Sequence, residues 1–501
     1  MNESNPVGLS PFGHDVGEAI TRVKSEDGLA YFGHFGVDEG LLRASFDKAL
    51  SRGGDWAELF FEHRIGHHVG LQDGAVNRAY SAISLGVGIR VIRGDQTGYA
   101  YTEDLSRSSV LNAASTAAVV AEGNAKPGPQ SFDVTPTPDR YPINVDWASV
   151  GISQKMPILQ SVNDRLFAAD NRILKAEVGF ADSESAVLVV DSNGAMRFDR
   201  QPMTRISVNC TAEMNGQRES NSMNLAGRHG FDYYTDARLD WLVNETVDRT
   251  TFLFEAKPAP AGALPLVLSA GSSGILLHEA IGHGMEADFN RKNISVYSDR
   301  LNQNIAPKDV TIVDDGTQAN ARGSINIDDE GADGQRTVLV ENGVLRTYMH
   351  DRISAQYYGV EPTGNGRRQS FRHAPLPRMR NTYMMPGPNT PEEIIGSVKR
   401  GIYAKTFTNG QVMIGAGDFT FYIKTGYLIE DGKLTQPIKD TNIIGNGPDV
   451  LQKTDMVGND FEFDEGGWVC GKDGQSVPVS LGMPTVRVSE ITIGGINGEA
   501  K

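Results

Sequence analysis

Residues 264–286 read LPLVLSAGSSGILLHEAIGHGME, and this stretch indicates how the second half of the chain is built. Its apolar start, 264–268, predicts a buried strand, and the Gly- and Ser-rich residues that follow predict a turn. Residues 275–286 then show the spacing of apolar side chains that is typical of a helix, although Gly282 and Gly284 interrupt it. We therefore expect a strand, a tight turn and a distorted helix in succession.

The distorted helix carries two histidines and a glutamate in the pattern H-E-x-x-x-H, at His278, Glu279 and His283. The zinc-peptidase helix carries H-E-x-x-H, in which both histidines lie on one face, one turn apart. With one more residue between them, the second imidazole of a regular α-helix points ~140° away from the first. Two interpretations stay open. The segment is either a core helix with two hydrogen-bonded histidines, or a metal site on a helix bulged between Ala280 and Gly284, where glycine makes a π-bulge least costly.

A catalytic zinc needs a third protein ligand, and the two cysteines are the first candidates. Cys210 lies on the apolar face of the strand predicted at 206–212, which favours a buried structural thiol. Cys470 lies in the Gly-rich segment 466–475, where the backbone can approach an ion closely, and Lys472 is near enough in sequence to favour a thiolate. Cys470 is therefore the candidate ligand, and an inert loop thiol is the alternative.

The fold class that we expect is α+β, in two domains joined by the Pro-rich linker 257–262. The N-terminal domain, 1–256, is predicted to consist of β-hairpins and helices. The C-terminal domain, 263–501, is predicted to be mostly antiparallel β with the metal-binding helix inserted, because Asn-Gly and Asp-Gly turns separate its apolar runs. Helical patterns in the first half fall at 40–53, 105–122, 153–169 and 235–250, and in the second half a capping box at Thr390 begins a short helix.

Composition and charge restrict the class of protein. The chain has 501 residues, a net charge of −16 and two cysteines. A polyanion is repelled by nucleic acid and by anionic lipid, so we expect neither as a partner. Two cysteines do not make a disulfide framework. The first residues, MNESNP, lack the features of a signal peptide, and no apolar run is long enough to cross a bilayer. We therefore expect a cytoplasmic protein that does not bind membranes.

Several blocks of sequence together resemble one known family, the TldD/PmbA metallopeptidases, and specifically the TldD branch that retains the HExxxH metal motif. The segment 278–288 is similar to the family's metal signature, with Ala287 where the family pattern has Gly. This difference puts the local turn in doubt and leaves the ligands in place. The resemblance extends over most of the chain, through blocks at 86–92, 98–104, 328–331, 363–368, 377–383, 456–460 and 470–475.

The resemblance implies a Zn²⁺ held by His278, His283 and Cys470, and hydrolysis of peptide bonds. It further implies pairing with a related TldE/PmbA-type subunit as a heterodimer, or with a second copy as a homodimer, around an internal cavity. In such a site Glu279 is expected to act as the general base that takes a proton from water.

Four further side chains are weaker candidates. Glu286 and Asp288 are expected to hydrogen-bond the imidazoles, the alternative being a solvated helix end. His373 is a candidate for stabilising the oxyanion, the alternative being a surface histidine. Arg368, with its neighbour Arg367, is a candidate for binding a peptide carboxylate, the alternative being structural ion pairs.

Taken together, the sequence predicts a zinc-dependent peptidase that hydrolyses extended or unfolded peptides. One alternative is another metal-assisted amide hydrolase, such as a deformylase or amidase, which a small closed pocket would indicate. The other is a regulatory or scaffold protein with a vestigial metal site, which the intact His278, Glu279, His283 and Cys470 argue against.

Overall fold

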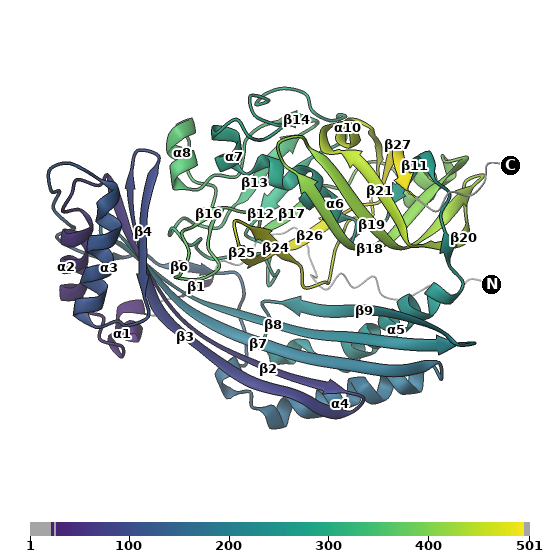
Figure 1. Cartoon of the computed structure of the whole chain (residues 1–501), viewed down its shortest axis with the longest axis horizontal. Coiled ribbons are helices and arrows are strands. Elements are labelled where there is room, and N and C mark those ends of the chain that lie inside the picture. The colour runs from purple at the N-terminus through teal and green to yellow at the C-terminus, as the bar shows by residue number, and fades with distance from the viewer. Residues whose placement is uncertain (1–21, 25–26, 495–501) are drawn as a thin grey trace.

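Long antiparallel strands form the first half of the chain. The computed structural model describes residues 22–24 and 27–494. A strongly bent sheet runs in the order β4-β3-β2-β7-β8-β5, and β9 pairs with β8 further along the same edge as β5 (Figure 1). All its pairings are antiparallel except that of β5 with β8. The strands are β2 (Trp56–Gln72), β3 (Ala75–Arg93), β4 (Gln96–Thr102), β5 (Asp133–Val134), β7 (Ile173–Asp191), β8 (Ala195–Met214) and β9 (Gln217–Gly227).

Two hairpins of this sheet turn where the sequence places Gly directly after Asp or Asn. Asp73 and Gly74, between β2 and β3, have φ of 51° and 81°, and Asn215 and Gly216 behave in the same way between β8 and β9. These are the backbone angles of a type I′ turn, whose twist matches that of the flanking strands. The hairpins predicted around Gly94 and at 186–198 are confirmed, but their strands reach 19 and 20 residues, far beyond the short apolar runs.

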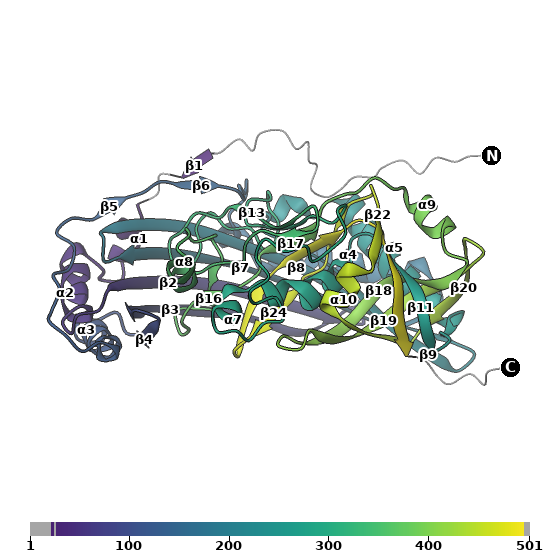
Figure 2. The ribbon, with the colours of Figure 1, turned by 90° about the horizontal axis from the view of Figure 1, so that it is seen from above.

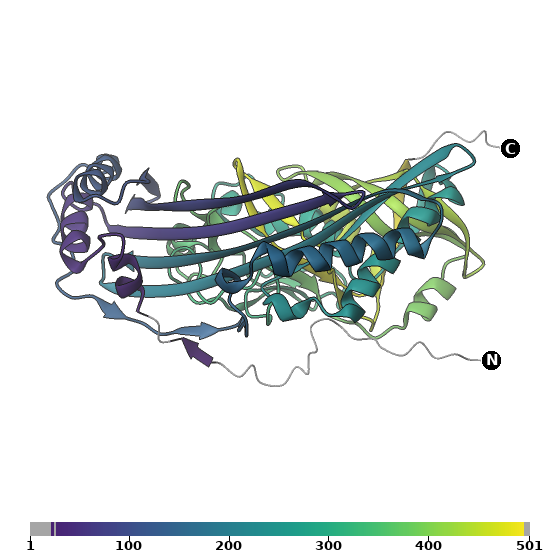
Figure 3. The same cartoon turned by 90° about the horizontal axis from the view of Figure 1, so that it is seen from below.

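Helices cover the end and the outer face of the long sheet. The four helices predicted in the first half are confirmed as α2 (Glu39–Ala49), α3 (Arg107–Ala117), α4 (Ile152–Ala169) and α5 (Asp236–Thr251). Figure 3 shows α4 and α5 lying against the face of the long strands that is turned away from the second half of the chain. With α1 (Gly28–Gly33), α2 and α3 pack at the other end of these strands (Figure 1).

Two smaller sheets build the second half, above the concave face of the long sheet (Figures 1 and 2). The eight-stranded one contains β10 (Lys257–Pro258), β11 (Gly262–Leu268), β18 (Arg400–Met413), β19 (Asp418–Glu430), β20 (Lys433–Lys439), β21 (Thr441–Asn446), β22 (Thr454–Val457) and β27 (Val486–Gly494). The six-stranded one contains β12 (Ile312–Asp315), β13 (Arg336–Glu341), β14 (Val344–Leu345), β17 (Asn381–Met384), β23 (Glu462–Phe463) and β26 (Ser480–Met483).

Short elements complete the chain. The helix predicted at Thr390 is confirmed as α9 (Pro391–Gly396), with its capping box formed. The other short helices of the second half include α8 (Arg352–Tyr358) and α10 (Gly447–Gln452). The remaining short strands are β1 (Arg22–Lys24), β6 (Thr137–Asp139), β15 (Gly366–Arg367), β16 (Leu376–Pro377), β24 (Val469–Lys472) and β25 (Gln475–Pro478).

The α+β fold class is confirmed, and two details of the second half differ from the prediction. Its sheets are mostly antiparallel, but three pairings are parallel: β10 with β20, β11 with β18, and β17 with β26. The linker 257–262 is not free chain throughout, because Lys257 and Pro258 form β10 and pair with β20. The domain division at 1–256 and 263–501 stays a prediction. No helix among residues 22–24 and 27–494 is long and apolar enough to span a membrane.

A buried charge network joins the long sheet to the second half. Arg90 on β3 contacts Glu58 on β2 at 2.9 Å and Glu330, from the second half, at 2.5 Å, and all three side chains are at most 1% exposed. The backbone N–H of Arg352 also donates to Glu330. Charges without water need such partners, so this network fixes how the two halves meet.

We expect Arg90→Met to lower the free energy of unfolding by about 3–5 kcal/mol, because Glu330 is left buried without its ion pair. Urea denaturation followed by fluorescence measures the loss. Arg346→Met is the matched control, since Arg346 pairs with Glu341 at the surface, where both side chains are about half exposed. Its loss should stay below about 1 kcal/mol. Equal losses in the two variants would contradict the role of the buried network.

Candidate metal centre

The helix that carries His278 and His283 makes a π turn between them. One turn of α-helix, α6 (Gly274–Leu277), leads into π-helical residues His278–Gly282, and a 3-10 turn follows at His283–Met285. The backbone N–H of His283 donates to the carbonyl of His278, an i→i+5 bond. An i→i+5 bond stacks residues five apart, as the i→i+4 bond of an α-helix stacks residues four apart. The predicted bulge is confirmed, and the two imidazoles face the same side.

Close packing holds this turn in place. A Cβ on Gly282 would lie 2.1 Å from the sulfur of Met379, and a Cβ on Gly284 would lie 2.6 Å from the ring of Tyr297. Neither contact is possible without moving a fully buried neighbour. Both glycines are therefore required by the approach of other segments, in addition to easing the bulge.

The structure brings Cys470 to the two histidines. The three ligand atoms all lie within 4.8 Å of one another, and Cys470 Sγ lies 3.4 Å from His283 Nε2. The two imidazole rings are 5.1 Å apart and nearly perpendicular. Cys470 does not lie in an irregular loop as expected, because the Gly-rich segment forms the hairpin β24–β25 around Asp473 and Gly474. Strand geometry thus fixes the direction of its side chain.

These donors fit a zinc ion. Imidazole and thiolate are both zinc ligands, three protein ligands leave the fourth position open as in catalytic sites, and thiolate disfavours magnesium and calcium. Zinc–nitrogen and zinc–sulfur bonds in tetrahedral geometry put the two donor atoms about 3.6 Å apart, close to the 3.4 Å found between His283 and Cys470. All three side chains are buried, at 2%, 5% and 2% exposure for His278, His283 and Cys470. The donors are therefore preorganised.

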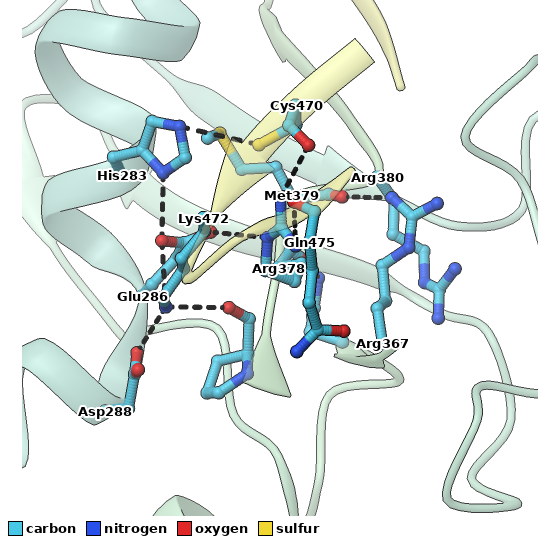
Figure 4. A network of polar contacts seen from close by, with 12 residues as sticks. His283, Glu286, Asp288, Arg367, Arg378, Met379, Arg380, Cys470, Lys472 and Gln475 are labelled. Atoms are coloured by element: carbon cyan, nitrogen blue, oxygen red, sulfur yellow. Dashed lines mark hydrogen bonds and ion pairs between the residues drawn. The ribbon is translucent and has the colours of Figure 1, made fainter. Parts of the chain in front are cut away.

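Glu286 holds the ring of His283. Its Oε2 lies 2.9 Å from Nδ1 of His283, as the dashed line in Figure 4 shows. Burial raises the pKa of the Glu286 carboxyl, but the charges of Lys472 and His283 outweigh it and bring the pKa to about 2. An ionised carboxylate only accepts hydrogen bonds, so Nδ1 carries the proton and Nε2, which faces Cys470, is left to bind an ion.

The thiol of Cys470 is activated by the imidazoles. Burial raises its pKa, but His278 and His283 lower it further, so that it lies well below the usual value. Lys472 does not contribute in the way that the sequence suggested. Its ammonium contacts Asp288 at 2.7 Å and Glu286 at 3.1 Å, and so points away from the sulfur (Figure 4). Side chains alternate along β24, so Lys472 lies on the same face of the strand as Cys470, two residues further along the chain.

Glu279 is the accessible acid of the centre. Its side chain is 23% exposed, and Oε2 lies 3.9 Å from His283 Nε2. This position beside the donors, open to solvent, suits a group that exchanges protons with water. Glu286, by contrast, is fully buried and contacts His283, so only Glu279 of the two glutamates is open to solvent.

The other candidates lie elsewhere or act differently. Asp288 pairs with Lys472, and no contact joins it to His278 or His283. His373 contacts Ser370 at 3.3 Å, and no contact joins it to the three donors among the residues that the structure describes. Arg368 is buried and pairs with Glu58, in the charge network between the two halves.

One residue of the centre was missed by the sequence reasoning. Arg378 is fully buried, and its Nη2 donates to the backbone carbonyl of Cys470 at 2.7 Å. Its Nε lies 3.9 Å from Glu286. It therefore anchors both the strand of Cys470 and the carboxylate that orients His283 (Figure 4). The block 377–383 was noticed for its family resemblance, but nothing in it separates Arg378 from the nearby Arg380.

Comparison with known families covers nearly the whole chain. Models described as PmbA/TldA metallopeptidase domain 1, central domain and C-terminal domain match residues 57–121, 146–251 and 261–495. The Metalloprotease TldD homolog of Haemophilus influenzae is 40% identical over 460 residues, which cover 90% of this chain and 95% of that protein. The Zinc metalloprotease TldD homolog of Saccharolobus solfataricus is 38% identical over 236 residues, 47% of this chain and 52% of that protein.

Solved structures share the fold at lower identity. A putative modulator of a DNA gyrase from Thermotoga maritima superposes with a TM-score of 0.73 at 21% identity, over 91% of this chain and 100% of that one. TldE from Thermococcus kodakarensis does so with a TM-score of 0.70 at 18% identity, over 91% and 99%.

We expect Cys470→Ala to lose its metal and Cys210→Ser to keep it. Removing a ligand that contacts the ion costs more than the 10- to 100-fold in affinity typical of removing a ligand's hydrogen-bond partner. Cys210 is the matched control, because it is equally buried but its thiol lies in the apolar core beside Thr250 and the carbonyl of Thr246, away from the two histidines. Zinc per chain after dialysis, measured by mass spectrometry, gives the answer. Equal zinc in the wild type and in Cys470→Ala would exclude Cys470 as a ligand.

Proposed function

This chain belongs to the PmbA/TldA metallopeptidase family, and we propose that the metal of this metallopeptidase is zinc, held by His278, His283 and Cys470. The proximity of these three donors across a π turn and a separate hairpin carries the proposal. The printed name of the Saccharolobus solfataricus relative, a zinc metalloprotease, supports the choice of ion. When bound, zinc supplies a Lewis acid that polarises a carbonyl and lowers the pKa of water.

Glu279 is the general base of the proposed reaction. Its carboxylate accepts the proton of the attacking water and delivers it to the leaving amine. Partial exposure keeps Glu279 in contact with solvent, and its 3.9 Å separation from His283 Nε2 keeps it beside the carbonyl to be attacked. Glu286 holds His283 by Nδ1 and Arg378 holds the strand of Cys470, so the reacting groups keep their positions during turnover.

Extended or unfolded peptides are the substrates that this site suits. His278, His283 and Cys470 are each at most 5% exposed, and a folded domain cannot bring a loop to groups buried so deeply. An extended chain is narrow enough, and its backbone hydrogen bonds leave side-chain preference loose. The other amide hydrolase and the vestigial metal protein are not retained, because the family relatives carry metalloprotease names.

A related subunit, or a second copy of this chain, is the proposed partner. Residues 75–86 of β3 extend beyond β4, which pairs only with Val87–Arg93. Among residues 22–24 and 27–494 no strand covers this half of β3, which is therefore an open sheet edge that exposes Val76, Tyr80 and Ile83. A long open edge with apolar side chains is a ready template for pairing with another chain. The similarity of the fold to TldE supports a subunit of that type.

We expect Glu279→Gln to retain zinc and bind peptide but to lose turnover by ~10²-fold or more, because an amide cannot accept the proton of water. Cleavage of a quenched fluorescent peptide, together with zinc content, measures both properties. Wild-type turnover in this variant would exclude Glu279 as the base.

The control for substrate class uses the same assay with one protein substrate, in its folded form and in a destabilised variant. The cleavage rate should follow the unfolded fraction of that substrate. Rapid cleavage of the folded form at a single loop would contradict the proposed preference for extended chains.

A further inference from the structure

An arginine-rich cavity lies between the long sheet and the second half of the chain, beside the hairpin that carries Cys470. Its volume is about 330 Å³. Glu62 and Asp329 are the two acids among its lining residues. The whole protein has a net charge of −16, but in the lining of this cavity arginines outnumber acids. The lining arginines are Arg64, Arg228, Arg322, Arg367, Arg368 and Arg380.

Most of this positive charge is not neutralised by the protein. Arg368 pairs with Glu58, but within residues 22–24 and 27–494 the other five lining arginines form no ion pair with a carboxylate. Arg367 donates to the carbonyls of Met379 and Pro478, and Arg322 donates to the carbonyl of Trp468 at 3.1 Å. Carbonyl oxygens satisfy hydrogen bonds but do not cancel a charge. The cavity is therefore a concentrated positive site.

The arginines also destabilise one another. Burial lowers the pKa of Arg322 to about 10, and the charges of Arg205, Arg228 and Arg64 add to this effect. Burial, followed by the charge of Arg380, holds the pKa of Arg367 well below its usual value. An anion in the cavity would relieve both the repulsion and the loss of hydration.

Several hydrogen-bond donors around the cavity have no partner. Arg228 and Arg380 are 3% and 1% exposed, yet Nε of the first and Nη2 of the second have no acceptor in the described part of the chain. The same holds for Nε2 of Gln201, which also lines the cavity. Buried donors without acceptors are rare in folded proteins. A carboxylate has two oxygens with about four acceptor positions, and it fits guanidinium groups in pairs.

The cavity begins one residue away from Cys470. Val469 and Pro478, which pair across β24 and β25, both line it. Successive side chains of a strand point to opposite faces, so Cys470 faces the histidines while Val469 faces the cavity. In Figure 4, His283 lies to the left of Cys470, and Arg367 and Arg380 lie to its right. Adjacent Cα atoms are about 3.8 Å apart, so a chain bound at the metal centre reaches the cavity within a few residues.

We propose that this cavity binds a carboxylate of the peptide substrate, so that cleavage falls within a few residues of an acidic group. The inference rests on the proposed peptidase function and narrows its substrate class. The carboxylate can come from the C-terminus of the peptide or from an Asp or Glu side chain, since both present the same two oxygens. Arg64 is the group that an incoming peptide meets, because it is exposed and its one hydrogen bond within the described residues goes to Ser183 at 3.2 Å.

The test measures binding without turnover, by fluorescence anisotropy of labelled, unstructured peptides on the Glu279→Gln variant. One pair of peptides has a free acid or an amide at the C-terminus, with no acidic side chain. A second pair is amidated and carries an internal Glu or Gln. We expect the carboxylate member of at least one pair to bind about tenfold tighter or more than its neutral twin. A preference in the first pair identifies the C-terminus as the source, and a preference in the second identifies a side chain.

Arg64→Met should reduce this preference at least about threefold, because it removes the exposed guanidinium from the cavity. Arg218→Met is the matched control, since Arg218 is exposed on β9 of the same sheet, pairs with Glu213 and does not line the cavity. It should leave the preference unchanged. Equal binding of the twins in both pairs, or a preference that Arg64→Met and Arg218→Met reduce equally, would overturn the inference. If the wild type does not cleave these peptides while Glu279→Gln keeps the binding preference, that result would instead count against the proposed function alone.

Discussion

Two histidines five residues apart can face one ion only if the helix between them makes an i→i+5 turn, and the rest of the metal centre depends on that turn. The bond from His283 N–H to the His278 carbonyl places both imidazoles on the side where Cys470 arrives from a distant hairpin. The turn leaves no room for side chains at Gly282 and Gly284, where Met379 and Tyr297 pack. A local departure from α-helical geometry thus determines which segments of the second half lie next to each other.

Buried charge is the second feature that organises this molecule. Around the metal centre, Glu286 accepts a hydrogen bond from His283 and faces the cationic side chains of Lys472 and Arg378. The arginine-rich cavity on the other side of the hairpin has the opposite character, because its positive charges outnumber their acidic partners. The β24–β25 hairpin therefore lies between a site whose buried carboxylates face cationic side chains and a cavity whose arginines outnumber their acidic partners. A negatively charged ligand in the cavity would supply the acidic partners that these arginines lack.

Much of this arrangement was predictable from local sequence, and the remainder depends on contacts between distant segments. The bulge followed from the spacing of His278 and His283, because two residues five positions apart do not lie on the same face of an α-helix. The turns followed from Asp-Gly and Asn-Gly pairs. The direction of Lys472 did not follow, since it is set by Glu286 and Asp288, far away in the sequence. The arginine cavity was equally hidden, because its lining comes from many stretches that are far apart in the sequence. The long strands were underestimated because polar residues line much of their length.

X-ray absorption spectroscopy at the zinc edge of the metal-loaded protein tests the central claim most directly, because it counts the atoms that contact the ion by type and distance. The account predicts two imidazole nitrogens at about 2.0–2.1 Å and one sulfur at about 2.3 Å, with the sulfur lost in Cys470→Ala and kept in Cys210→Ser. A spectrum without sulfur, or one that Cys470→Ala leaves unchanged, would contradict it.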